Sequence, residues 1–255
     1  MKSLFTIFLC CLSWQILAQT NPLVGTWMME SDTMKEIKIL TPTHYSFVVL
    51  DAKNNKVAYT GYGTYSVQNG KYIENAEYGN FELDKSKKLE FDYKVEGDKF
   101  YQKGSVTLAD GTINRINNSF TKVKLPAQNN PATGTWNQLT SSGVDAKGEK
   151  WSHTSATHIR YMTISPTHYI IIRQKDKQFE DVLAGSYRME GDNFIPNWEF
   201  VSNPVTDDIK IKIIQRIQAG KLLWDGMMVD KEGTHTWHDV YEKVNGKPAK
   251  TASTK

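Results

Sequence analysis

Cysteine is almost missing from this chain of 255 residues, and its two cysteines, Cys10 and Cys11, stand side by side near the start. From residue 19 onward there is none, which excludes disulfide bonds and thiolate metal sites there. That part must be held together by buried apolar side chains, for which about 100 residues per domain suffice. It also lacks an apolar run long enough to form a membrane-spanning helix, so we expect no transmembrane segment after residue 18.

The first 18 residues are typical of a cleaved secretory signal. Lys2 provides the positive start, residues 4–17 form a short apolar run, and Ala18 is a small residue at the expected cleavage point. Lipid anchoring is the lesser alternative, because Leu9 rather than a small residue precedes Cys10. We therefore expect a secreted or periplasmic protein.

The formal net charge of +3 comes from the two ends of the chain. Lys2 lies in the signal, and Lys247, Lys250 and Lys255 lie in a tail over residues 245–255 that we expect to be disordered. Without these four lysines the remaining chain is slightly acidic. It has no basic stripe, so nucleic-acid binding is not expected.

One stretch of the sequence occurs twice. Residues 18–27 and 127–136 share the pattern A-Q-x-N-P-x-x-G-T-W at an offset of 109 residues. Later pairs of segments also match, for example 41–45 with 165–169 and 120–123 with 241–244. A repeat of this length predicts two copies of one domain rather than a solenoid of small units. We place the copies at residues 22–124 and 130–244.

Each copy is predicted to consist of a series of short β-strands. In the first copy, turn residues separate eight segments at 24–29, 34–40, 45–50, 57–67, 71–78, 87–95, 99–108 and 112–123. Residues 89–96 alternate strictly between apolar and charged side chains, as expected for an antiparallel strand with one buried face. Closing such a meander removes its open edges. The sequence therefore predicts an all-β protein of two tandem eight-stranded antiparallel up-and-down barrels.

The first strand of each copy carries Gly-x-Trp, and the last carries a basic residue. This pattern resembles the lipocalins and the wider calycin group, most closely the small lipocalin-like domains of exported bacterial proteins. Further matching segments are Pro42-Thr43-His44-Tyr45, Gly63-Thr64-Tyr65, Glu96-Gly97-Asp98 and Phe120-Thr121-Lys122-Val123. The resemblance covers residues 22–244. It implies that Trp27 and Trp136 close the barrel floors, with Lys122 and Lys243 in place of the family's arginine as cation–π partners.

Aligning the two copies indicates which side chains point into each barrel. The expected ligand-binding residues of the first copy are Tyr65, Tyr72, Glu74, Tyr93 and Gln102, and those of the second are Tyr187, Trp198 and Trp224. Aromatic walls with a few polar groups are usual for small-molecule sites, although such residues can equally be plain core. Glu74 is the most informative of them, because an inward carboxylate must pair, bind or be protonated. The second interior is expected to be the more apolar one.

The second copy has 15 extra residues between its first two strands, within residues 137–165. Their Ser-, Gly- and Lys-rich composition predicts a mobile loop over the barrel mouth. Trp151 lies in this loop and is costly to leave exposed. We therefore expect Trp151 either to fold down as a lid on a ligand or simply to rest on the nearest groove.

No pattern in the sequence indicates catalysis. There is no nucleophile elbow, no phosphate-binding glycine loop and no histidine pair at same-face strand spacing, so no metal and no cofactor are expected. The function predicted is non-enzymatic binding of a small hydrophobic or amphipathic molecule. Two alternatives stay open, namely a protein- or glycan-binding module with filled barrels, and an enzyme that uses Glu74. The sequence does not indicate a protein partner.

Overall fold

The computed structural model describes residues 21–245, apart from residues 85, 156–157, 177 and 204–207. The expected signal (1–18) and all of the expected tail except Asn245 lie outside the described residues. The regular secondary structure of the described part consists of β-strands. Within that part, no helix has the length and apolarity needed to cross a membrane.

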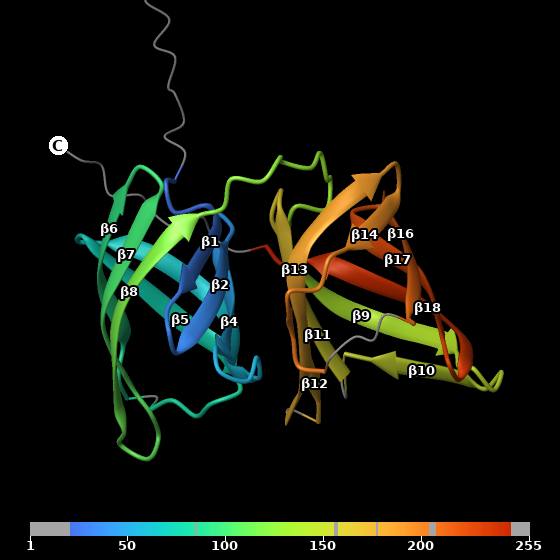
Figure 1. Cartoon of the computed structure of the whole chain (residues 1–255), viewed down its shortest axis with the longest axis horizontal. Helices are drawn as coiled ribbons and strands as arrows, with labels where there is room; N and C mark the ends of the chain where they lie inside the picture. The colour runs from blue at the N-terminus through green and yellow to red at the C-terminus, as the bar shows by residue number, and fades with distance from the viewer. Residues whose placement is uncertain (1–20, 85, 156–157, 177, 204–207, 246–255) are drawn as a thin grey trace, which may run out of the picture.

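The first copy forms a closed antiparallel barrel in simple sequential order. Its strands are β1 (Gly25–Glu30), β2 (Met34–Leu40), β3 (His44–Asp51), β4 (Val57–Gln68), β5 (Lys71–Gly79), β6 (Leu89–Glu96), β7 (Lys99–Thr107) and β8 (Ile113–Lys122). Trp27 on β1 pairs with Lys122 on β8, and this pairing closes the barrel. The predicted strand positions and the closure are confirmed (Figure 1).

The second copy repeats this plan with two changes. Its strands are β9 (Gly134–Val144), β10 (Lys150–Thr154), β11 (His158–Ile164), β12 (His168–Lys175), β13 (Gln178–Glu190), β14 (Asn193–Pro196), β15 (Phe200–Val201), β16 (Lys210–Gln218), β17 (Lys221–Asp230) and β18 (Gly233–Lys243). β9 pairs with β18 and closes the barrel. The fifth strand of the first barrel corresponds to two pieces here, β14 and β15, and β10 is an extra strand.

The insertion of the second copy is not the mobile loop that its composition suggested. It extends β9 to Val144 and returns as β10, which pairs with β9 from Lys150 to Thr154. Backbone ladder bonds stabilise this hairpin whatever its side chains are, so a polar composition did not preclude it. Trp151 lies on β10, where its ring packs directly against Gly143. Residues 141–144 also pair with β18, so this part of the insertion belongs to the barrel wall.

The floors of the two barrels are built alike. Trp27 and Trp136 are buried, and each indole nitrogen donates a 2.7 Å hydrogen bond to a carbonyl four residues earlier. Lys122 Nζ lies 5.2 Å from the Trp27 ring centroid, and Lys243 Nζ lies 5.6 Å from that of Trp136, within the usual cation–π range. The glycine before each Thr-Trp pair has a positive φ, and a Cβ there would crowd the lysine stem. The repeated G-T-W motif thus makes room for the covering lysine.

The two barrels pack against each other through the outer faces of β2–β4 and β11–β13 (Figure 1). The shared apolar cluster comprises Ile37, Ile39, Val48, Leu50 and Tyr62 from the first barrel, with Tyr161, Ile170, Ile172, Val182, Ala184 and Phe200 from the second. Tyr62 and Tyr161 stack with their ring centroids 3.5 Å apart. Aromatic pairs of this kind add about 0.5–1.5 kcal/mol to the burial of apolar area. Strands of this interface are therefore buried on both faces.

Polar contacts across the interface follow a pseudo-two-fold symmetry. Thr26 and Ser165 share a 2.7 Å hydrogen bond, and their counterparts Thr135 and Thr41 lie 3.5 Å apart. Each pair joins the first strand of one barrel to the Pro-containing turn of the other. The floor ends of the two barrels consequently meet at this point.

We expect the substitution Ile172→Asp to disrupt the interface between the two barrels. Ile172 is fully buried between the barrels, and an unpaired carboxylate there should lower the free energy of unfolding by about 3 kcal/mol or more. Ile217→Asp on β16 is the matched control, because Ile217 is 40% exposed and should change stability by less than about 0.5 kcal/mol. Urea titrations of both variants measure this. Equal effects of the two substitutions would contradict the interface.

Candidate functional site

The interior of the first barrel is packed at one end and hollow at the other. Around Trp27, the rings of Tyr72, Phe100 and Phe120 fill the floor half, with centroids 5.4–5.8 Å apart along this stack. The mouth half contains a cavity of about 530 Å³, which we call the first chamber. Its walls are mostly apolar, and they include Met29, Phe47, Phe81, Leu89 and Val106. Cavities of roughly 300–1,000 Å³ are typical of small-molecule sites.

A band of charged and amide side chains separates the packed floor from the first chamber. Lys38 Nζ lies at its centre, 3.2 Å from Glu74 Oε1, 3.0 Å from Gln102 Oε1 and 3.7 Å from Glu36 Oε1. Asn118 Nδ2 donates to Glu36 Oε2 at 3.2 Å. All five side chains line the chamber. We call this set the charged band; it carries two carboxylates against one ammonium group.

Burial shifts the protonation of the charged band. Glu36 is 5% exposed, and this desolvation raises its pKa from 4.5 to about 7. The nearby Lys38 ammonium opposes the rise in pKa, whereas the Glu74 carboxylate adds to it. Near neutral pH, Glu36 therefore exchanges between a charged and a neutral form, and the band changes its net charge by one.

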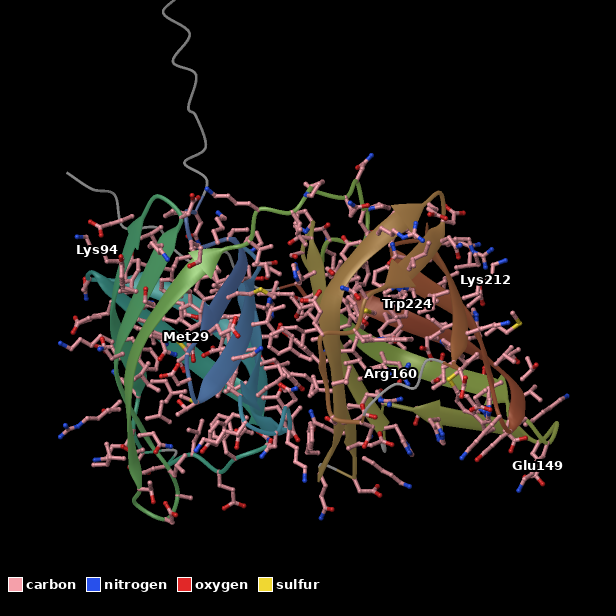
Figure 2. The ribbon with its side chains drawn as sticks, viewed as in Figure 1. Met29, Lys94, Glu149, Arg160, Lys212 and Trp224 are labelled. Carbon is pink, nitrogen blue, oxygen red and sulfur yellow. The ribbon has the colours of Figure 1, made fainter. Side chains whose placement is uncertain are left out.

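The second barrel contains a chamber of about 510 Å³, the second chamber. Aromatic and branched side chains form most of its wall, among them Ile171, Phe194, Trp198, Trp224 and Trp237. Figure 2 shows Met29 inside the first barrel and Trp224 inside the second, while Lys94 and Lys212 extend into solvent. Both barrels therefore enclose a hollow of similar size.

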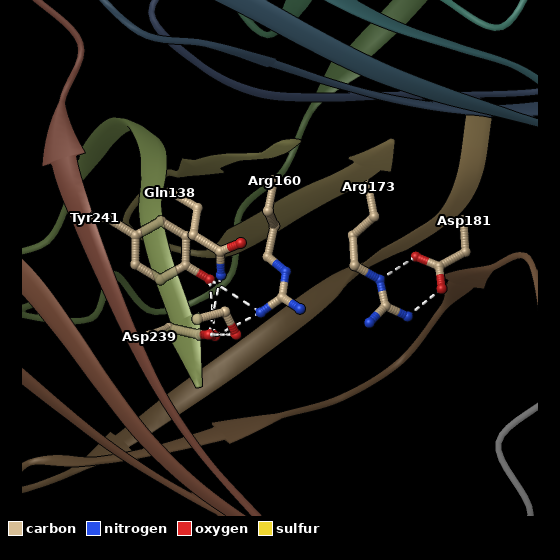
Figure 3. A network of polar contacts seen from close by, with 7 residues as sticks. Gln138, Arg160, Arg173, Asp181, Asp239 and Tyr241 are labelled. Carbon is tan, nitrogen blue, oxygen red and sulfur yellow. Dashed lines mark hydrogen bonds and ion pairs between the residues drawn. The ribbon is translucent and has the colours of Figure 1, made fainter. Parts of the chain in front are cut away.

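Two arginine–aspartate pairs lie beside the second chamber (Figure 3). Arg160 Nη1 donates to Asp239 Oδ2 at 2.5 Å, and Arg173 forms a two-bond ion pair with Asp181. Asp239 is completely buried and accepts further hydrogen bonds from Gln138, Ser141 and Tyr241. A buried carboxylate satisfied in this way is stable only while its partners remain.

Two polar residues of the first chamber, Glu36 and Asn118, have charged counterparts at equivalent positions of the second. The strand registers match Glu36 with Arg160 and Asn118 with Asp239. The hydrogen bond from Asn118 to Glu36 in the first barrel thus corresponds to the Arg160–Asp239 ion pair in the second. At the same depth of the barrel, one copy presents a carboxylate and the other a guanidinium.

No known family model matches this chain, and no curated protein matches it in sequence. Solved structures match it only weakly. A protein of unknown function from the DUF3598 family of Nostoc punctiforme is 9% identical with a TM-score of 0.31, over 88% of this chain and 97% of that one. Transferrin binding protein B of Neisseria meningitidis is 8% identical with a TM-score of 0.29, over 83% of this chain and 66% of its own.

A third match is the DNA polymerase sliding clamp of Pseudomonas aeruginosa, 8% identical with a TM-score of 0.14, over 89% of this chain and 58% of that one. The chain thus spans 66% of the second of these proteins and 58% of the third. Likenesses as weak as these establish neither fold nor function. The tandem-barrel architecture rests on the strand pairing described above.

The structure separates the expected ligand residues of the first copy into two groups. Glu74 and Gln102 line the first chamber and meet at Lys38. Tyr65 and Tyr72 belong to the packed floor, and Tyr93 packs against the same cluster. The Tyr65 hydroxyl donates to the Thr41 carbonyl at 2.8 Å. These three tyrosines therefore do not line the chamber for which they were predicted.

The second copy gives a similar result. Trp151, Trp198 and Trp224 line the second chamber. Tyr187 does not, because its hydroxyl donates to the Ser165 carbonyl at 2.8 Å, as Tyr65 does at the equivalent turn of the first copy. The lining of the second chamber is the more apolar of the two, as expected, although two ion pairs lie beside it.

Sequence reasoning missed the residues at the centre of both sites: Glu36, Lys38, Asn118, Arg160, Arg173, Asp181 and Asp239. On β2, charged and apolar residues alternate from Glu36 to Ile39, and apolar residues normally mark the inward face. Here that face meets the other barrel.

Four of the six histidines lie in ring stacks or at turns. The His153 and His158 rings stack with centroids 3.9 Å apart, and Trp151 stacks on His153. His44 and His168 are buried at the Pro-Thr turns, where each ring contacts the preceding threonine hydroxyl. Among the residues that the structure describes, no cluster of three metal-ligating side chains occurs.

Replacement of Glu36 by glutamine should make the protein less sensitive to pH. Because the folded pKa is raised, a buried protonated Glu36 is favourable below about pH 4.5, and this stabilisation is lost as the pH rises through about 7. The wild-type chain should lose roughly 3 kcal/mol from this group across that range. Glu36→Gln should not, so it should gain stability relative to wild type between pH 5 and pH 8.

Urea midpoints at the two pH values measure the difference. Glu90→Gln on β6 is the control, because Glu90 is exposed. If Glu36→Gln and the wild type show the same pH dependence, Glu36 does not titrate near neutral pH.

Proposed function

We propose that this protein binds a small amphipathic molecule in the first chamber. The observation that carries the proposal is a hollow apolar half-barrel that ends at a buried charged band. A barrel that serves only as a scaffold gains stability by filling its core, because empty apolar space forgoes packing energy. A chamber of about 530 Å³ therefore favours a ligand over the alternative of a filled interaction module.

The entrance of the chamber also fits an apolar ligand. Met34, Tyr59 and Ile113 line it and are 38%, 40% and 63% exposed. Such side chains at the rim of a pocket offer an incoming apolar molecule a first contact. Phe81 sits inside, edge-on to Tyr59 with ring centroids 5.8 Å apart, and narrows the space behind the rim.

The charged band defines the head group that would fit. Lys38 directs its ammonium toward three acceptors of the protein itself, which leaves the carboxylates of Glu36 and Glu74 in excess. A ligand head that donates hydrogen bonds, or carries a positive charge, complements this excess better than an anion would. The hydrophobic part of the ligand would then lie toward Met29, Phe47 and Leu89.

We further propose that the protein is a lipocalin-like binding protein without catalytic activity that acts outside the cytoplasm. Three features support a lipocalin-like protein: the resemblance in the Gly-x-Trp strands, the lysine over each floor tryptophan, and the sequential eight-stranded barrels. The ion pair between Glu74 and Lys38 supports the lack of catalysis, because it engages the carboxylate that an acid–base role would need. The apolar leader supports a location outside the cytoplasm.

A tryptophan at position 106 should block the first chamber. Val106 faces the chamber from β7, whereas its neighbour Ser105 is exposed on the outer face. We expect Val106→Trp to weaken binding of N-phenyl-1-naphthylamine, an apolar fluorophore with one N–H donor, by tenfold or more. Ser105→Trp should bind it as the wild type does, with blue-shifted emission.

Native mass spectrometry of the purified chain complements this titration, since a ligand retained from the host adds its mass to the folded protein. Equal binding by the two tryptophan variants would contradict the assignment of the chamber. Absence of saturable fluorophore binding by the folded wild type would contradict the proposed function itself.

A further inference from the structure

The second chamber holds two arginines that the proposed function leaves unused. Arg160 on β11 and Arg173 on β12 are direct cross-strand partners, and both line the chamber. Like charges directly opposite each other on one face of a sheet are destabilising. The aspartates behind them, Asp239 and Asp181, relieve part of this repulsion. What remains is a pair of guanidinium groups facing one apolar space.

Each guanidinium is bound by its aspartate on one side only. Arg173 uses Nε and Nη2 for Asp181, and Arg160 uses Nη1 for Asp239 and Tyr241. Among the described residues, Arg160 Nε and Nη2 and Arg173 Nη1 have no hydrogen-bond acceptor. Figure 3 shows the two side chains next to each other, with the unbound nitrogen of each directed toward the other. The Nε–Nη2 edge of Arg160 is the fork that matches a carboxylate with two parallel hydrogen bonds.

The charge balance of this site favours one added negative charge. The two aspartates neutralise the two arginines overall, but they lie on the far side of the guanidiniums from the open nitrogens. Asp239 is fully buried and shared among four donors, so it has little capacity to attract a cation. His235, which also lines the chamber, lies with its Nε2 3.3 Å from Asp230 Oδ2.

The side chains that line the second chamber indicate which ligand body would fit beside the charged group. Trp198, Trp224 and Phe194 offer flat aromatic faces, and Ile171 and Ile211 offer branched apolar surface. We propose that the second chamber binds a small carboxylic acid with an aromatic or aliphatic body, whose carboxylate is held between Arg160 and Arg173. The inference does not depend on the first chamber. It assigns the two copies ligands of different charge, because the position of Arg160 is occupied by Glu36 in the first copy.

The test uses the full mature chain carrying Val106→Trp, so that only the second chamber is open. Phenylacetate, 1-naphthaleneacetate and octanoate are titrated by calorimetry, each beside its uncharged primary amide. We expect at least one of the carboxylates to bind about tenfold or more tightly than its amide. Leu183→Trp, which fills the second chamber, should abolish this binding.

The arginines are then tested directly. Arg173→Gln should reduce the preference for the carboxylate over the amide, and Arg216→Gln should leave it unchanged, because Arg216 is an exposed arginine paired with Asp225. Since Arg160→Gln alone would leave Asp239 without its cation, Arg160→Gln is combined with Asp239→Asn, and thermal melting confirms that the protein is folded.

Two results would overturn the proposal. One is that no carboxylate binds the folded Val106→Trp chain better than its amide does. The other is that the preference for the carboxylate persists when both arginines have been replaced. Either outcome leaves the assignment of the first chamber intact, because that chamber is blocked throughout.

Discussion

The apolar contact between the two barrels is the constraint on which the interior chemistry depends. It covers the outer faces of β2–β4 and β11–β13, so these strands are buried on both sides. In an ordinary surface strand the apolar face points inward and the charged face meets water. Here Ile37 and Ile39 face the other barrel, and the alternate residues Glu36 and Lys38 are left to face the barrel interior. The interface thus directs charged groups into the chambers.

Buried charge then determines how each interior is filled. Side chains that carry charge need partners within reach, and they cannot be surrounded by packed hydrocarbon. In the first barrel, Lys38 contacts Glu74, Gln102 and Glu36. In the second barrel, Asp239 accepts hydrogen bonds from Arg160, Gln138, Ser141 and Tyr241. In both copies the aromatic floor lies on one side of these polar groups and a hollow on the other. The two copies share this plan, but Glu36 of the first corresponds to Arg160 of the second and Asn118 to Asp239.

Most of the fold could be predicted from the sequence, because it depends on local pattern. Alternation, turn residues and the repeated Gly-x-Trp segment predicted the strand positions of the first barrel and the closure of both barrels. The alternation of side chains along a strand predicts which of them point into the barrel. It does not predict how far along the barrel axis each of them lies. Parity therefore predicts Tyr65 and Tyr187 as ligand contacts, whereas their hydroxyls donate to turn carbonyls at the floor.

Two other features were not predictable from a single strand. The orientation of β2 and β11 depends on a partner surface far away in the sequence, which parity alone does not reveal. The hairpin of β9 and β10 depends on backbone pairing, to which a polar composition gives no clue. Glu74 and Gln102, which the alignment predicts to point into the barrel, line the first chamber, but Lys38, which contacts both, was missed.

The central claim is that each barrel is hollow beyond its buried charged groups. X-ray diffraction from crystals pressurised with xenon tests it most directly, because xenon enters dry apolar cavities. The account predicts xenon peaks in the first chamber near Phe47 and Leu89 and in the second near Ile171 and Trp198, with none among the packed rings around Trp27. Chambers filled by the protein's own side chains, with no xenon in either, would contradict it.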